Sequence, residues 1–121
     1  MIKKNDNHNP LKITLNLLDN KFKFEIIYNL LEKKMRFGEL KIISNINQQL
    51  LTKLLKQLEK DKLIKKKIFS GFPRKVEYSI STFGLLLKPM FNSIIKWEEK
   101  NKKILLKNIK KRKIESLYDY Y

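Results

Sequence analysis

Cysteine is absent from the 121-residue sequence, and histidine occurs once, as His8. Without thiols the chain has no disulfide framework, no cysteine nucleophile and no cysteine-ligated zinc or iron–sulfur site. A single histidine likewise excludes histidine metal clusters and Ser-His-Asp catalysis. We therefore expect no catalytic residues, no metal and no cofactor, and we expect that the protein is not an enzyme.

Long apolar runs are also missing. Uninterrupted apolar stretches reach only three residues, whereas a membrane-spanning helix needs about 20. The first ten residues, MIKKNDNHNP, lack the apolar segment of a signal peptide. We expect no membrane insertion and an intracellular protein, in the cytoplasm or nucleoid of a bacterium or the nucleus of a eukaryote. Hydrophobic residues still make up 42% of the chain, which is enough for the core of one domain.

Acidic residues are scarce relative to basic ones. Twelve Asp and Glu stand against 28 Lys and Arg, so the net charge is 28 − 12 = +16. This excess predicts a polyanionic partner, with nucleic acid as the first candidate and an anionic membrane surface as the second. The basic run at residues 110–113 has three interpretations: a nuclear localisation signal, a non-specific DNA tail, or a solvated helix end favoured by the helix dipole.

Periodicity predicts a mainly helical chain with one small β-hairpin. Residues 11–18 fit both a helix and a strand, and Asn9-Pro10, which can cap and open a helix, favours the helix. Further helices are expected over 22–32, 39–43 and 48–60, and strands over 35–37, 63–69 and 75–80.

The C-terminal part predicts one long helix. Ser81 or Thr82 can cap it, Pro89 should kink it, and the polar residues 98–103 offer a point where it could split in two. The expected organisation is a flexible arm over 1–9, a domain over 10–100 that includes dimerisation helices, and a basic helical extension and tail over 101–121.

The expected helix 48–60, with Asn47 as its N-cap, has two contrasting sides. Leucines recur on one side, and amide, hydroxyl and ammonium groups occupy the other without an acid near its centre. Gln48 and Gln49 can pair bidentately with adenine, and Thr52 can meet a thymine methyl group. Lys53 and Lys56 can reach guanine or phosphates. The alternative interpretation is an ordinary solvated helix face.

The expected hairpin is strongly basic. It carries Lys65, Lys66, Lys67, Arg74 and Lys75 against the single acid Glu77. Such an arm suits a DNA backbone or minor groove, with Arg74 as its best groove probe. Lysines that guard a sheet edge against aggregation are the alternative. The residues predicted to bind DNA are Asn47, Gln48, Gln49, Thr52, Lys53, Lys56, Lys65, Lys67, Arg74 and Lys75.

The order of elements, mainly α with a small β-wing, is that of a winged helix-turn-helix. Several motifs then resemble the HxlR-type winged helix-turn-helix transcription regulators, relatives of the MarR-like group. They are DNKF at 19–22, FGEL at 37–40, KVEY at 75–78 and ISTFG at 80–84, together with the leucine pattern of 46–64. The resemblance covers about residues 9 to 100.

This resemblance implies a homodimeric, sequence-specific regulator of transcription on double-stranded DNA, with the recognition helix 47–60 in the major groove and the wing 65–75 on the backbone or minor groove. The first and last helices would form the dimer interface through Leu11, Leu15, Leu18, Leu87, Met90, Phe91, Ile94 and Trp97. Many relatives carry a sensing cysteine where this chain has Asn9, so a thiol switch is excluded here. The sequence does not identify a small-molecule effector, which is left open.

Two alternatives remain open at the level of sequence. The chain could bind DNA or RNA generally, without promoter specificity. It could instead be a protein-interaction or anionic-membrane-surface module, because residues 100–113 hold eight basic residues and no acid.

Overall fold

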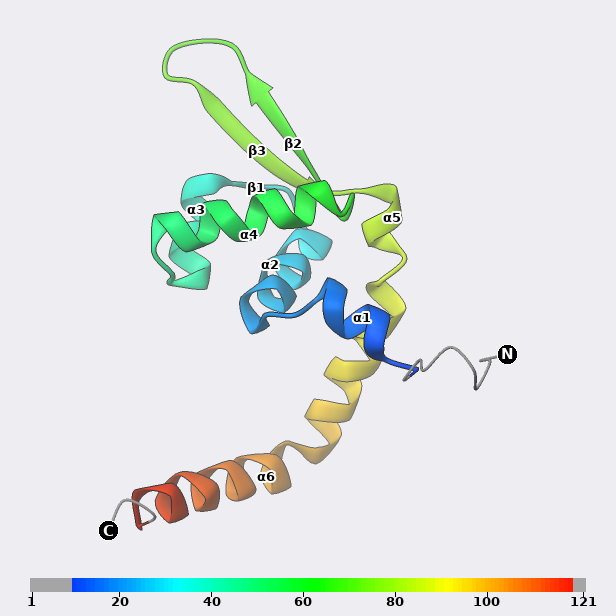
Figure 1. The fold of residues 1–121 in the computed structure, drawn as a ribbon, viewed down its shortest axis with the longest axis vertical. Helices are drawn as coiled ribbons and strands as arrows, with labels where there is room; N and C mark the ends of the chain where they lie inside the picture. Colours follow the sequence, from blue (N-terminus) through cyan, green and yellow to red (C-terminus); the bar gives the residue numbers. More distant parts are fainter. Residues whose placement is uncertain (1–9, 119–121) are drawn as a thin grey trace. The chain divides into compact units, whose positions relative to one another are not determined.

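The structure, a computed structural model, describes the backbone of residues 10–118 and the side chains of residues 10–113. The elements are α1 (Lys12–Leu17), α2 (Lys21–Glu32), β1 (Met35–Arg36), α3 (Phe37–Ser44), α4 (Gln48–Lys60), β2 (Ile64–Phe69), β3 (Lys75–Ile80), α5 (Thr82–Leu85) and α6 (Lys88–Tyr118) (Figure 1). The predicted mainly helical fold with a small β-wing is confirmed. The chain divides into two compact units, one that ends at Leu86 and one that begins at Leu87.

The ambiguous segment near the N-terminus is helical, as predicted. Helix α1 begins at Lys12, with Leu11 in the N-cap position and no side-chain hydrogen bond to the cap. The prediction that Pro10 opens the helix is therefore wrong, because Pro10 lies in a turn before it. Asn9, its predicted cap, lies outside the described residues.

The core lies between α2, α3, α4 and the inner part of the sheet. Its fully buried side chains are Ile26, Ile27, Leu40, Leu51, Leu55, Leu58 and Leu63. Helix α4 has the predicted bounds, and its leucine side is buried as expected, with Leu50 only half-buried. Burying one such side chain contributes about 1.5–3 kcal/mol, so the leucine row fixes which side of α4 faces outward.

The sheet has three antiparallel strands in the order β1-β3-β2. The β2–β3 pairing runs from Ile64↔Ile80 at its root to Phe69↔Lys75 near its tip. Only Ile64 is buried in β2, so the outer part of the hairpin has no core beneath it and extends beyond α4 as a wing (Figure 1). Strand β1 ends one residue earlier than predicted because Phe37 already opens α3.

The long helix expected from residue 82 is interrupted. Ser81 caps the short helix α5, and a separate helix, α6, begins at Lys88. The disruption predicted at Pro89 is a break before it rather than a kink, because Pro89 is the second residue of α6, where its missing N–H and fixed φ suit the first turn. Residues 98–103 do not split α6.

The predicted boundary after residue 100 falls inside α6, and the three predicted segments stay a prediction. Within residues 10–118, no helix combines the length and the apolar character needed to cross a membrane.

Candidate nucleic-acid interface

The N-terminus of α4 gathers four of the predicted DNA-binding residues in one place. Asn47, Gln48, Gln49 and Thr52 line an open hollow of about 650 Å³. The first three are exposed, and Thr52 is half-buried. Unpaired backbone N–H groups and the positive end of the helix dipole favour anions at such an end. The hollow therefore combines side chains that can form hydrogen bonds with base edges and a helix end that favours anions.

Asn47 has a structural task as well. Its side-chain Oδ1 accepts a hydrogen bond from the backbone N–H of Leu50 at 2.8 Å, which caps α4. The carbonyl oxygen of this amide is thus engaged in the cap, while its NH₂ group stays available to a ligand. Gln48 and Gln49 carry the amides that are suited to bidentate pairing.

The lysines of α4 follow the same outward side. Lys53 and Lys56 are exposed, and each lies four residues after one of the polar residues of the hollow. Side chains four apart are neighbours on a helix. Lys53 and Lys56 thus extend the polar hollow into a basic strip along α4.

The wing has two different faces because side chains alternate along its strands. The face toward the core carries Met35, Ile64 and Tyr78, all buried. The opposite face carries the predicted residues Lys65, Lys67 and Lys75, all exposed. Arg74 is exposed just before β3.

Arg36 joins this basic wing face, and sequence reasoning missed it. Strand β1 pairs with β3 so that Arg36 lies opposite Glu77, which in turn lies opposite Lys67. Arg36 is exposed and helps to line a hollow of about 490 Å³ at the wing. The sequence does indicate a short strand at 35–37, but the partner of that strand is a long-range property.

The end of α4 is joined to the root of the wing just before β2. The backbone N–H of Leu63 donates a hydrogen bond of 3.0 Å to the carbonyl oxygen of Leu58, and both side chains are fully buried. At the wing root, burial raises the pKa of the Tyr78 hydroxyl, and the negative charge of Glu59 in α4 adds to this shift.

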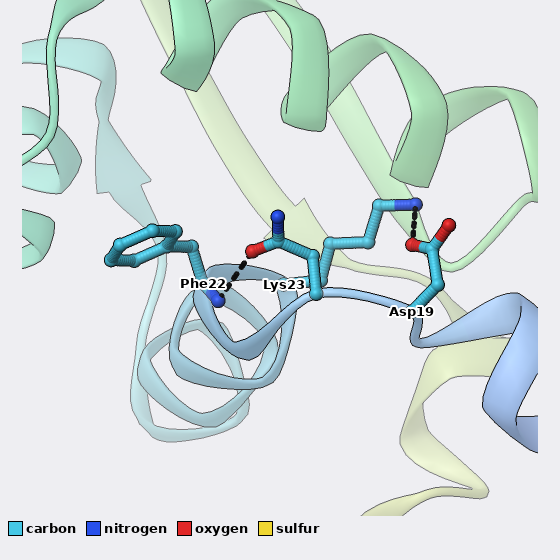
Figure 2. Close-up of polar contacts among 4 residues, drawn as sticks. Asp19, Phe22 and Lys23 are labelled. Carbon is cyan, nitrogen blue, oxygen red and sulfur yellow. Dashed lines mark hydrogen bonds and ion pairs between the residues drawn. The ribbon is translucent and has the colours of Figure 1, made fainter. Parts of the chain in front are cut away.

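A buried lysine lies at the start of α2. Lys23 is 3% exposed, and its Nζ forms an ion pair of 2.9 Å with Asp19 Oδ1 (Figure 2). The hydrogen bond and positive charge of Lys23 lower the pKa of the Asp19 carboxyl, with a smaller effect from Lys53. Beside this pair, Asn20 Oδ1 accepts a hydrogen bond from the backbone N–H of Phe22 and caps α2.

The residues predicted for a dimer interface differ in exposure. In the first unit, Leu11 and Leu15 are exposed, whereas Leu18 is buried; in the second unit, Ile94 and Trp97 are exposed, Leu87 and Met90 are half-buried, and Phe91 is buried. The exposed members are free to meet another surface. The buried pair already contributes to the interior of this chain, and the interface itself stays a prediction.

Comparison with known proteins agrees with this geometry. Residues 17–105 match the family described as HxlR-like helix-turn-helix. The uncharacterized HTH-type transcriptional regulator YdeP of Bacillus subtilis is 37% identical over 94 residues, which cover 77% of this chain and 73% of YdeP. A regulator of the same description from Halalkalibacterium halodurans, BH0655, is 40% identical over 100 residues, covering 81% of this chain and 88% of its own.

Solved structures of regulators share the fold. The redox regulator HypR in its reduced form superposes with a TM-score of 0.74 at 34% identity and covers 80% of this chain and 97% of its own. The reduced transcriptional regulator YodB from B. subtilis gives 0.66 at 25% identity, with 83% and 94% covered. The matched residues 17–105 include the capped helix α4 and the wing, and this chain belongs to the HxlR-like helix-turn-helix family.

Proposed function

We propose that this protein is a sequence-specific, double-stranded DNA-binding regulator of transcription that acts as a homodimer. Helix α4, with its cap at Asn47, enters the major groove, and the wing at 65–75 follows the backbone or minor groove. The relatives are named as regulators of transcription rather than as enzymes, and a protein of this kind works where the DNA is, in the cytoplasm of a bacterial cell.

One observation carries this proposal. The polar hollow at the start of α4 and the basic face of the wing belong to one compact unit, and the hydrogen bond from Leu63 to Leu58, between two fully buried residues, joins the end of α4 to the root of the wing. The major groove is about 12 Å wide and admits an α-helix, which reads bases through the residues of its first turns. A basic wing at a fixed place beside it adds contacts to phosphates.

Selection from a random duplex library at physiological salt tests the proposal. We expect enrichment of a pseudo-palindrome with half-sites about 34 Å apart, because two recognition helices must enter successive major grooves. The selected duplex should compete far better than a scrambled duplex or a single-stranded RNA. Equal competition by all three would replace the proposal with general nucleic-acid binding.

Substitutions on α4 show whether the hollow reads the bases. Gln49→Ala and Thr52→Ala should each relax selectivity by about 1–3 kcal/mol per lost base contact. Gln57→Ala is the matched control, because it removes an amide two turns beyond Gln49 on the same helix. If all three substitutions change selectivity equally, the hollow is not the reading site.

Salt dependence measures the role of phosphate contacts. With about 6–10 such contacts, affinity should fall about 10³- to 10⁵-fold between 50 and 200 mM salt. A flat salt dependence would contradict binding through the basic surface.

A further inference from the structure

The tip of the wing displays an aromatic ring to solvent. Phe72 is fully exposed, at 104% of its reference surface. Its neighbours are Gly71, whose φ of +141° is accessible mainly to glycine, and Pro73, whose ring restricts the backbone. Leaving a phenyl ring in water forgoes the free energy that its burial would contribute. Phe72 is thus available for contact with another molecule.

The surroundings of this ring are cationic. Arg36, Phe69, Lys75 and Glu77 line the same hollow as Phe72, and Arg74 follows two residues after it. The ammonium group of Lys67 lies 4.8 Å from the centre of the Phe69 ring. An apolar tip within a basic rim is complementary to a polyanion whose interior is apolar, and the DNA duplex, with stacked bases between phosphates, has this character.

The hairpin is long enough to place the Phe72 ring inside a DNA groove. From Ile64↔Ile80 to Phe69↔Lys75 the paired strands advance by five residues, or about 17 Å at about 3.3 Å per residue. A minor groove is about 7.5 Å deep. The tip can therefore enter the groove while the root of the wing stays packed on the core.

We propose that Phe72 is a minor-groove wedge: its ring inserts between two base pairs, partly unstacks them and bends the duplex. Phenylalanine is among the residues that kink DNA in this way. Flexible pyrimidine–purine steps yield most easily, so Phe72 would select such a step at a fixed distance from the bases read by α4. This inference rests on the proposed function and adds to it a determinant that reads deformability.

The test compares three variants of the full chain on the selected duplex, labelled at its ends for energy transfer. Wild-type protein should bend the duplex by about 20–90°. Phe72→Ala should abolish the bend and weaken binding about 10- to 100-fold, the equivalent of burying one ring. Phe72→Leu should keep most of the bend, because leucine also serves as a wedge.

Arg74→Gln is the matched control at the same tip. It should leave the bend in place but reduce the slope of log affinity against log salt by about 1, because a phosphate contact is lost. Phe72→Ala should instead lower affinity equally at every salt concentration. Since Phe72 is fully exposed, its replacement should leave the thermal midpoint unchanged, which verifies that the variant is folded.

The outcomes separate the two proposals. If wild-type protein selects no duplex, the proposed function fails. If it selects one but Phe72→Ala keeps the bend and the affinity, only the wedge is wrong, and a protein partner at the tip would give this result. A Phe72→Ala variant that loses salt dependence as Arg74→Gln does would also overturn the wedge.

Discussion

At the scale of single residues, Lys23 is the clearest departure from an apolar interior. Lysine is almost never fully buried unless it is paired, and here the partner is Asp19, four residues earlier and just before α2. The spacing of four residues is visible in the sequence, yet periodicity alone gives no reason to place Lys23 inside. Its burial depends on tertiary packing rather than on the local spacing.

Replacing Asp19 tests this pair. Asp19→Asn leaves the buried ammonium of Lys23 without a carboxylate, so we expect a lower midpoint of urea unfolding at pH 7. Lys23→Met removes the charge and keeps an apolar stem, and Asp19→Asn in that background should then have little effect. A double-mutant cycle measures this difference. Equal effects of Asp19→Asn in both backgrounds would show that the two residues do not interact.

The pH dependence of the same pair has a definite sign. The pKa of Asp19 is lowered in the folded protein from its usual value of 3.8, so the carboxylate stabilises the fold at all pH values above 3.8. This contribution is lost as the pH falls through the folded pKa. The stability advantage of wild type over Asp19→Asn should therefore persist from neutral pH down to pH 3.8 and be lost below it, as the pH falls through the lower pKa of the folded protein.

At the scale of elements, the sequence predicted those helices and turns whose bounds depend on residues that are close together in the chain. The Asn47 cap and the leucine period give α4 its bounds, and the turn-forming residues 70–74 predict the hairpin. The anchoring of the start of α5 was not predictable in this way. Ser81 Oγ lies 2.6 Å from the carbonyl oxygen of Lys62 and 2.9 Å from that of Leu63, and accepts a hydrogen bond from the Gly84 N–H. Those carbonyls lie 18 and 19 residues away along the chain.

Gly84 offers a prediction at this junction. A Cβ added there would lie 2.2 Å from the carbonyl oxygen of Leu63 and 2.8 Å from Ile80 Cδ1. Gly84→Ala should therefore force α5 away from the wing root and destabilise the protein by about 1–3 kcal/mol, as overpacking does. Urea unfolding followed by circular dichroism measures this loss.

Gly38 provides the matched control. It lies in α3, and a Cβ there would meet nothing within 4 Å. The same change to alanine should be neutral or should stabilise the helix by up to about 1 kcal/mol. Equal effects at the two positions would mean that the close approach at Gly84 is not a packing constraint.

At the scale of the whole molecule, the charge of +16 governs solubility and attraction to DNA rather than the fold. The exposure of several large apolar side chains still needs an explanation. Leu11, Ile13 and Leu15 of the first unit are 57–66% exposed, and Ile94 and Trp97 of α6 are 44% and 58% exposed. Ile13 was not among the predicted interface residues. Side chains of this kind, clustered on two helices, favour contact with a second copy of the chain.

Ile94→Lys tests that assembly. In a two-fold symmetric dimer the substitution occurs twice, and each lost apolar side chain removes at least about 1.5 kcal/mol of burial free energy. The total loss of about 3 kcal/mol should raise the dissociation constant of the dimer about a hundredfold or more. Sedimentation velocity across a dilution series measures it. Ile42→Lys is the matched control, because Ile42 is 82% exposed on α3, outside the predicted interface.

Two recognition helices reach successive major grooves only when two protomers are joined. Ile94→Lys should therefore also weaken binding to a palindrome while leaving binding to a single half-site unchanged, and an equal loss on both duplexes would contradict a dimer on DNA.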